Sequence, residues 1–293
     1  MVKAQLPVNT RFILNPRSGG AARAEAPVRA FAAREGAELR FTTAAGHARE
    51  LAREAVAAGC RLVVAVGGDG TVNEVASALT GTEVLLGIVP GGSGNGLGRA
   101  LGLPLPPAAA LEVLRSGRDR WIDTALADGR PFFNVAGLGL EAALAERFNR
   151  TARRGLAGYL RVAAGSLDLL RAAAFTIEAD GVRRELRALT VAVANGQQYG
   201  GHAFIAPGAS LDDGRLDVTA VPPITPLNAL PLVTALFRGT LDARTDVFRA
   251  SSSRIVIERP SPGPLHTDGE VRAGGSRVEF TVRPASLRVL SPA

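Results

Sequence analysis

The stretch that decides the fold reads LVVAVGGDGTVNEV and extends from Leu62 to Val75. Its apolar, valine-rich first half predicts a buried strand, and the glycines that follow predict a tight turn before a helix from about Asn73. Glycines let backbone N–H groups approach a bound anion, and a helix N-terminus favours negative charge. Asp69 would repel a bare phosphate, so its place in the turn points to a metal–phosphate complex such as a magnesium nucleotide.

The N-terminal part of the chain alternates between strands and helices. Strands are expected at residues 11–14, 38–42, 61–66 and 85–89, and helices at about 25–35, 48–56 and 73–79. This order predicts a parallel sheet, in which ligands bind beyond the carboxyl ends of the strands. Glycine-rich loops follow residues 14, 66 and 89, so all of them are expected at one edge of the sheet. We therefore predict an α/β nucleotide-binding domain over residues 1–124.

After residue 124 the pattern changes. Strand-like segments occur at 132–136, 175–179, 189–194, 216–221, 254–258 and 278–283, mostly without helices between them. Helical insertions are expected at about 139–173 and 226–238. The sequence therefore predicts a second, mainly antiparallel domain over residues 125–285.

Arginine supplies almost all of the positive charge. The 34 basic and 27 acidic residues give a net charge of +7, and Lys3 is the only lysine. P-loop enzymes and protein kinases are excluded, because the first need a lysine in the glycine loop and the second need one on a strand. Phosphate would have to be neutralised by backbone amides, a metal ion or arginine. Nucleic-acid binding is not expected, since no basic run is interleaved with aromatic residues.

Cysteine content and hydropathy limit the cellular context. The single cysteine, Cys60, excludes a disulfide framework and a multi-cysteine zinc site. No signal peptide and no apolar run of about 18 residues is seen, because prolines interrupt the most apolar segment, 220–237. A soluble, cytoplasmic protein is expected. Peripheral contact with a membrane stays open, since the arginine-rich insertion and the leucines of 227–237 would suit a membrane surface or a core equally well.

Two acidic turns occur in the second domain. Asp268 and Glu270 lie on either side of a glycine, and both could face one site because alternate residues of a strand point the same way. Such carboxylates could accept a hydroxyl proton or hold Mg²⁺, although Asp-Gly is also a common hairpin turn. The segment 206–217 contains three more acids and could bind Mg²⁺ or Ca²⁺, but turn chemistry alone would also explain it.

These motifs, in this order and spacing, resemble the diacylglycerol kinase catalytic domain family, which includes bacterial lipid kinases and sphingosine kinases. The resemblance extends over nearly the whole chain. The matching segments are NPRSG at 15–19, GGDGTVNE at 67–74, GSGN at 92–95, NVAGLG at 134–139, VANG at 193–196, LDDGRLDV at 211–218 and DGE at 268–270.

The resemblance implies an ATP-dependent lipid kinase of two domains. The first domain would be similar to phosphofructokinases and NAD kinases, and the second would be a β-sandwich that binds the lipid substrate at a membrane surface. The last strand, at about 286–291, would rejoin the first domain. A homodimer is compatible with this reading.

The resemblance also implies site residues. The nucleotide contacts fall on Asn15, Pro16, Arg17, Ser18, Gly19, Thr42, Gly68, Asp69, Gly70, Thr71, Val72, Asn73, Glu74 and Ser93. Asp69, Asp268 and Glu270 would be catalytic, with one of the last two as the proton acceptor. A structural Mg²⁺ would be held by the carbonyls of Ser210 and Arg215 and the side chain of Asp213.

Departures from the family pattern leave the acceptor open. Gly96 stands where bacterial diacylglycerol kinases commonly have an acid, which is closer to the sphingosine kinases. Glu141 and Gly208 each stand where an aspartate is usual. Diacylglycerol and a sphingoid base are therefore both candidate acceptors. The alternatives are a kinase of a soluble acceptor, as in NAD kinases, and a non-catalytic regulator that binds nucleotide or lipid.

Overall fold

The computed structural model describes residues 6–7, 9–149, 165 and 171–293. The chain divides into two compact units: unit 1 comprises Met1–Ile122 and Ala285–Ala293, and unit 2 comprises Asp123–Pro284. The sequence places the division after residues 124 and 285. Among the described residues, no helix is long and apolar enough to cross a bilayer.

Unit 1 is a parallel α/β fold. Its strands lie in the order β2-β1-β3-β4, all parallel, and the end of the last strand of the chain joins them by pairing Val289 with Leu86. The elements are β1 (Thr10–Leu14), α1 (Ala21–Glu35), β2 (Glu38–Phe41), α2 (His47–Ala57), β3 (Leu62–Gly67), α3 (Asp69–Leu79), β4 (Leu85–Pro90), α4 (Gly96–Ala100) and α5 (Pro107–Ser116). The predicted parallel sheet is confirmed.

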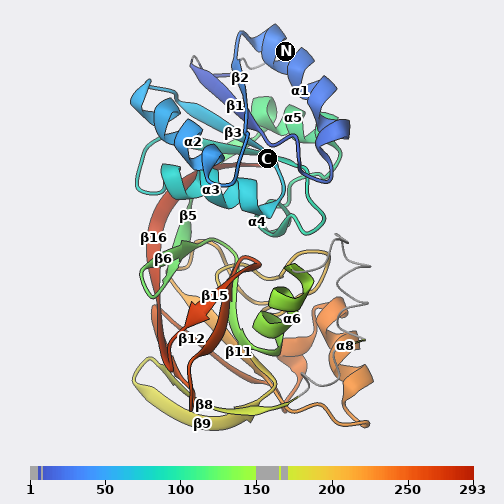
Figure 1. The fold of residues 1–293 in the computed structure, drawn as a ribbon, viewed down its shortest axis with the longest axis vertical. Coiled ribbons are helices and arrows are strands. Elements are labelled where there is room, and N and C mark those ends of the chain that lie inside the picture. The colour runs from blue at the N-terminus through green and yellow to red at the C-terminus, as the bar shows by residue number, and fades with distance from the viewer. Residues whose placement is uncertain (1–5, 8, 150–164, 166–170) are drawn as a thin grey trace. The chain divides into compact units, whose positions relative to one another are not determined.

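Helices cover both faces of this sheet. Helices α1 and α5 pack together on one side of β1 and β3, and α2 and α3 pack together on the other (Figure 1). Strands β1, β3 and β4 are buried along their whole length, as expected for a parallel sheet covered on two sides. The glycine-rich loops follow the carboxyl ends of these strands.

Helix α3 begins four residues earlier than predicted. Gly68 is extended, and its carbonyl accepts the N–H of Val72, so the helix starts at Asp69 and not near Asn73. Gly70 has poor helix propensity, which is why the sequence suggests a turn at this point. As a result, Asp69 lies in the first turn of a helix, where a negative charge is favourable.

Unit 2 is a sandwich of two mainly antiparallel sheets. One sheet has the order β12-β11-β10-β7-β14-β15, and the other contains β16, β13, β8 and β9 with β5 and β6 beside them. The strands are β5 (Arg118–Ala127), β6 (Arg130–Phe132), β7 (Val135–Gly139), β8 (Ala173–Ala179), β9 (Val182–Ala188), β10 (Thr190–Ala194), β11 (Leu216–Val221), β12 (Phe248–Ser252), β13 (Arg254–Glu258), β14 (Gly263–Thr267), β15 (Glu270–Gly274) and β16 (Arg277–Ser291). The predicted fold class is confirmed.

The sandwich has an apolar core on each face of its first sheet. Between the sheets, Leu138 and Val193 pack against residues such as Ile257 and Phe280 of the second sheet. On the outer face, a second cluster joins Val135 to helix α8 (Ala229–Arg238) and the short helix η2 (Leu241–Ala243). Helix α8 is therefore anchored directly on the sheet, and the predicted insertion at 226–238 is confirmed.

The other predicted insertion is described only in part. Helix α6 (Leu140–Asn149) follows β7 without a break and packs against β14. The remainder of the predicted insertion at 139–173 lies outside the described residues apart from Gly165 and residues 171–173.

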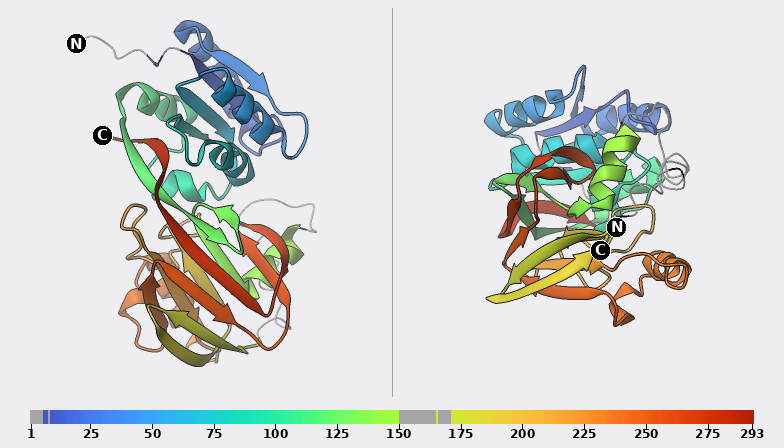
Figure 2. Two further views of the ribbon diagram at one scale, coloured as in Figure 1. Left: turned by 90° about the vertical axis from the view of Figure 1, so that its left-hand side faces the viewer. Right: turned by 60° about the horizontal axis from the view of Figure 1, so that its bottom comes forward.

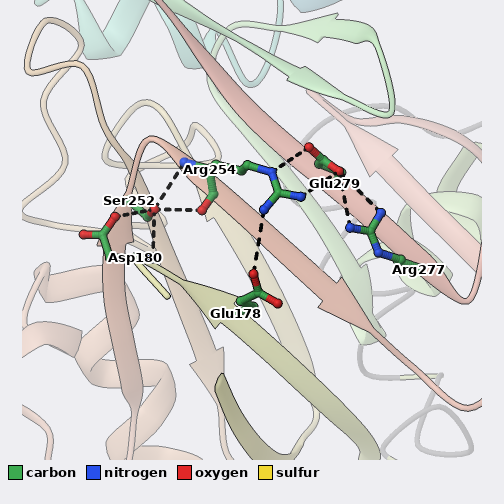
Figure 3. Close-up of polar contacts among 6 residues, drawn as sticks. All are labelled: Glu178, Asp180, Ser252, Arg254, Arg277 and Glu279. Atoms are coloured by element: carbon green, nitrogen blue, oxygen red, sulfur yellow. Dashed lines mark hydrogen bonds and ion pairs between the residues drawn. The ribbon is translucent and has the colours of Figure 1, made fainter. Parts of the chain in front are cut away.

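Strands β8, β13 and β16 share a network of polar side chains, drawn in Figure 3. Arg254 Nε lies 2.8 Å from Glu279 Oε1, and its Nη1 lies 3.7 Å from Glu178 Oε1. Beside them, the Ser252 hydroxyl donates to Asp180 Oδ1 at 2.7 Å. The Arg254 ion pairs are at the surface, where such pairs contribute little to stability, so we assign the network to strand alignment and not to function.

Candidate nucleotide and acceptor sites

Backbone hydrogen bonds join the three glycine-rich loops of unit 1 at one sheet edge. The Asn15 N–H donates to the Val66 carbonyl at 3.0 Å. Gly20 donates to Gly91 and Gly91 donates to Gly67, each at 2.7 Å. Loops that are distant in sequence therefore form one continuous backbone surface, as the strand pattern predicts.

The glycines are required because the loop backbones touch. A Cβ atom added to Gly92 would lie 2.7 Å from Gly68 Cα, and one added to Gly20 would lie 2.9 Å from the Gly91 carbonyl oxygen. Real Cβ atoms do not come this close to backbone atoms. The surface is thus free of side chains where a phosphate would need to approach N–H groups.

Asp69 braces two of these loops. Its Oδ2 accepts the Asn95 N–H at 2.9 Å, and its Oδ1 accepts the Gly96 N–H at 2.6 Å. Burial raises the pKa of Asp69, while the two N–H groups act in the opposite direction. A Cβ on Gly94 would lie 2.7 Å from Oδ2, so the carboxylate fills the space that this glycine leaves.

Two asparagines complete the loop framework. Asn15 Nδ2 donates to the Thr71 hydroxyl at 3.0 Å, which links the first loop to the start of α3. Asn95 is in the left-handed region and closes the third loop by bonding both its side-chain oxygen and its nitrogen to the backbone of Gly92 at 2.8 Å. The sequence motif contains Asn95 but gives no sign of this bracing role.

Several groups at this edge are available to a ligand. The residue before α3, Gly68, has no side chain to cap the helix, so the N–H groups of Gly70 and Thr71 in its first turn can receive an anion. Ser18 Oγ is buried without a hydrogen-bond partner in the described structure. Gly19, Gly70 and Ser93 are exposed beside these groups. A hydroxyl without a partner and nearby N–H groups could all donate hydrogen bonds to the oxygens of a phosphate.

Three other predicted contacts have evident structural roles. The Glu74 carboxylate accepts the N–H groups of Gly46 and Ala48 at 2.8 and 3.0 Å, and thereby caps helix α2. The side chain of Val72 is buried in unit 1, and Thr42 is buried at the end of β2. Asn73 is half-buried, and Pro16 and Arg17 are exposed in the first loop.

In unit 2, Asp268 and Gly269 form the turn between β14 and β15. Both have positive φ, 50° and 85°, which is the arrangement of a two-residue type I′ hairpin. The Asp268 carboxylate accepts the N–H groups of Phe133, Asn134 and Val135 at 2.8, 2.9 and 3.0 Å. Asp268 therefore holds the backbone of residues 133–135, where β7 begins.

Glu270 differs from Asp268 in its surroundings. It begins β15, pairs across the hairpin with Thr267, and is exposed. Its carboxylate can therefore meet an incoming hydroxyl, whereas that of Asp268 is already occupied by backbone donors. Of the two acids that the sequence leaves equivalent, the geometry favours Glu270 as the proton acceptor.

A buried polar cluster adjoins this turn, and sequence reasoning assigns it no role. Glu141 Oε1 lies 3.5 Å from His266 Nε2, and both side chains are buried. The Tyr199 hydroxyl is buried without a partner among the described residues, and its ring lies 6.1 Å from that of His266. Burial raises the pKa of Glu141, and the nearby His266 acts against the rise. Gly137 makes room, since a Cβ there would fall 1.4 Å from Glu141 Oε1.

The predicted Mg²⁺ loop has oxygen donors but no complete set of acidic side chains. The Asp213 carboxylate accepts the Arg215 N–H at 3.0 Å, and the Ser210 hydroxyl donates to Asp212 at 2.6 Å. Burial raises the pKa of Asp217, and the charge of Asp213 raises it further. A cation would relieve that repulsion. No group of three or more His, Cys, Asp or Glu side chains in the described structure is arranged to hold a metal, so carbonyl oxygens and water would have to complete the site.

Both units match known protein families. Residues 9–127 match the diacylglycerol kinase catalytic domain, and residues 134–291 match the YegS C-terminal NAD kinase beta sandwich-like domain. The chain belongs to the diacylglycerol kinase catalytic domain family. A relative from Pseudomonas aeruginosa named "Probable lipid kinase YegS-like" is 34% identical over 259 residues, which cover 87% of this chain and 84% of the relative.

Other relatives agree with this placement. A protein of Mycobacterium tuberculosis named "Diacylglycerol kinase" is 32% identical over 253 residues, covering 84% of this chain and 81% of that protein. A crystal structure described as a diacylglycerol kinase from Bacillus anthracis has a TM-score of 0.72 at 22% identity, and the match covers 99% of this chain and 98% of the other. That similarity concerns the fold.

Proposed function

We propose that the protein is a lipid kinase that transfers the γ-phosphoryl group of Mg-ATP to a hydroxyl of a diacylglycerol or a sphingoid base. The observation that carries the proposal is the loop framework of unit 1, in which Asp69 holds the third glycine loop beside the first turn of α3, a helix preceded by a glycine. Membership of a family whose members are named as lipid kinases supports the lipid as acceptor.

On the donor side, the loops would hold the nucleotide phosphates. Backbone N–H groups of the α3 first turn and the free Ser18 hydroxyl would bond phosphate oxygens, and no lysine is available among the described residues for this purpose. Mg²⁺ would be bound together with the nucleotide and would neutralise part of the negative charge of its phosphates. Asp69 would act through the loops that it positions, because each of its oxygens already accepts a backbone N–H.

On the acceptor side, Glu270 would take the proton of the lipid hydroxyl as the hydroxyl oxygen attacks the γ-phosphorus. The bond between the γ-phosphorus and the bridging oxygen breaks, ADP leaves, and the lipid phosphate forms. Asp268 would keep the hairpin in place by its three backbone bonds. In-line transfer of this kind depends mainly on positioning and charge, which the backbone N–H groups of unit 1 would supply on the donor side.

The test is transfer of labelled γ-phosphate from Mg-ATP to diacylglycerol, monoacylglycerol and sphingosine in mixed micelles, with NAD as a soluble acceptor. The Asp69→Ala variant serves as the control. We expect one lipid class to be labelled by the native protein and not by the variant. Label on NAD alone would indicate a soluble acceptor, and ATP binding without any labelled product would indicate a regulator.

A further inference from the structure

Helix α8 has apolar residues on two opposite faces. Leu232 and Ala235 point into the outer cluster of unit 2. In contrast, Leu227, Leu230, Val233 and Phe237 are 89%, 74%, 48% and 37% exposed. Their spacing of three, three and four residues places them along one side of the helix and the turn before it. We call these four residues the apolar stripe.

This concentration is unusual for the molecule. Within the described part of the chain, the remaining exposed large apolar residues are Leu105, in the loop before α5, and Val182, on β9. Scattered exposed apolar residues need no explanation, but a contiguous group marks a surface that binds something apolar. Helix α8, orange in Figure 2, lies at the rim of unit 2 in both views, where a partner could reach it.

The stripe is held in a fixed conformation. The Thr225 N–H donates to Asn228 Oδ1 at 2.7 Å, and the Asn228 N–H donates to Thr225 Oγ1 at 3.3 Å. This reciprocal pair closes the turn of residues 225–228 that leads into the helix. Gly239 ends α8 in the left-handed conformation. The apolar side chains are thus presented by a rigid element, so little conformational entropy would be lost on binding.

Charge favours a lipid surface over a protein partner. Between Val218 and Leu241 the chain has a single charged residue, the exposed Arg238, and no acid. On the helix itself, anionic headgroups would therefore meet a cation and no carboxylate; the next acid along the chain is the exposed Asp242 of η2. A stable dimer needs roughly 800 Å² and 20 or more residues from each partner, far more than four side chains supply. Interfacial helices, by contrast, bind with one apolar face in the boundary between headgroups and acyl chains.

We propose that α8 is the element by which the protein docks on an anionic lipid bilayer, with the apolar stripe inserted and Arg238 among the headgroups. The inference rests on the proposed function, for which the acceptor is a membrane lipid. Helix α8 is also connected to the turn at 268–270 through Val135. Val135 packs in the same cluster as Leu232, and its N–H is one of the three that hold Asp268.

The experiment is co-sedimentation with vesicles of phosphatidylcholine containing phosphatidylglycerol, without nucleotide. The variant Leu227→Glu/Leu230→Glu changes two highly exposed positions, and Val182→Glu is the matched control, since Val182 is 68% exposed on β9. We expect the double variant to lose vesicle affinity by more than about tenfold while Val182→Glu retains it, because each leucine would otherwise leave water. Thermal midpoints check folding, and Arg238→Gln should weaken binding to anionic vesicles more than to neutral ones.

The possible results separate the two proposals. Equal vesicle binding by the native protein and the double variant overturns the docking surface, as does a native protein that does not bind vesicles. Sedimentation that shows a dimer lost in the double variant would overturn it in favour of an interface between copies. Vesicle binding that depends on the stripe, in a protein that labels no lipid, would leave the docking surface standing and refute the kinase proposal.

Discussion

At the residue scale, the acids of the turn at 268–270 differ in what they contact. Asp268 receives three backbone N–H groups, whereas Glu270 is exposed. Sequence reasoning treats them as equivalent because both flank Gly269 on a strand-like stretch. The difference arises from the type I′ turn, which directs the Asp268 carboxylate toward residues 133–135, more than a hundred positions earlier in the chain. No local pattern reveals that contact.

The substitution Asp268→Asn tests the structural role. An amide presents an NH₂ group to at least one of the backbone donors, which leaves that donor without a partner. We expect the free energy of unfolding in urea to fall by about 1–3 kcal/mol. Glu270→Gln should change it by less than about 0.5 kcal/mol, as expected for an exposed side chain. Equal destabilisation by both changes would contradict the distinction between the two acids.

Gly94→Ala tests the brace in unit 1. The new methyl group would displace the Asp69 carboxylate, since its Cβ would lie 2.7 Å from Oδ2. Overpacking of this kind lowers the free energy of unfolding by about 1–3 kcal/mol. Strain in the nucleotide-binding loops would also raise the dissociation constant for Mg-ATP by about tenfold or more. Gly208→Ala is the control, because no atom lies within 4 Å of an added Cβ there. Calorimetric titration with Mg-ATP measures the affinity of both variants. An unchanged affinity in Gly94→Ala argues against the role of Asp69 in holding the loops.

At the scale of elements, periodicity locates most strands and helices of unit 1, because buried strands alternate with amphipathic helices. It fails at β9, where the first four side chains are exposed and the arginines obscure any apolar alternation. It also splits β16 at Pro284, although the strand continues from Arg277 to Ser291. Glycine content misplaces the start of α3. In each case a tertiary contact outweighs the local preference.

Element packing also creates the Glu141–His266 pair, which joins the first turn of α6 to β14. Because the folded-state pKa of Glu141 is raised, the folded protein binds this proton more tightly than the unfolded chain. The stabilising contribution is complete below the unfolded pKa and declines as pH rises toward the folded value. Glu141→Gln removes this decline.

We therefore expect Glu141→Gln to gain stability relative to the native protein as pH rises above the ordinary glutamate pKa of 4.5. Urea unfolding of both proteins at several pH values measures the difference. A difference that stays constant across these pH values would show that Glu141 does not titrate as proposed.

At the scale of the whole molecule, each unit has its own apolar core, and the candidate ligand groups are divided between them. The three glycine-rich loops belong to unit 1, whereas the hairpin at 268–270 and helix α8 belong to unit 2. The sequence motifs identify both sets. They do not reveal the roles of Asn95, Glu74 or Asp268 as braces, because those roles depend on backbone groups brought near by the fold.

This division predicts a local response to nucleotide. Mg-ATP should slow amide hydrogen exchange in residues 15–20, 67–71 and 91–96, because bound N–H groups are protected and the loops open less often. The hairpin of β8 and β9, on the far side of unit 2's own sandwich from α8, should exchange at an unchanged rate. Protection confined to β8 and β9 would refute the assignment of the nucleotide to unit 1.

The most direct test of the account is phosphate transfer to lipid by Glu270→Gln, with Mg-ATP binding measured on the same preparation. If unit 1 holds the donor and Glu270 accepts the proton, transfer falls by about 10²-fold or more while the affinity for Mg-ATP is unchanged. Transfer at the native rate, or loss of transfer that follows a loss of nucleotide binding, would contradict the assignment of Glu270 and the mechanism built on it.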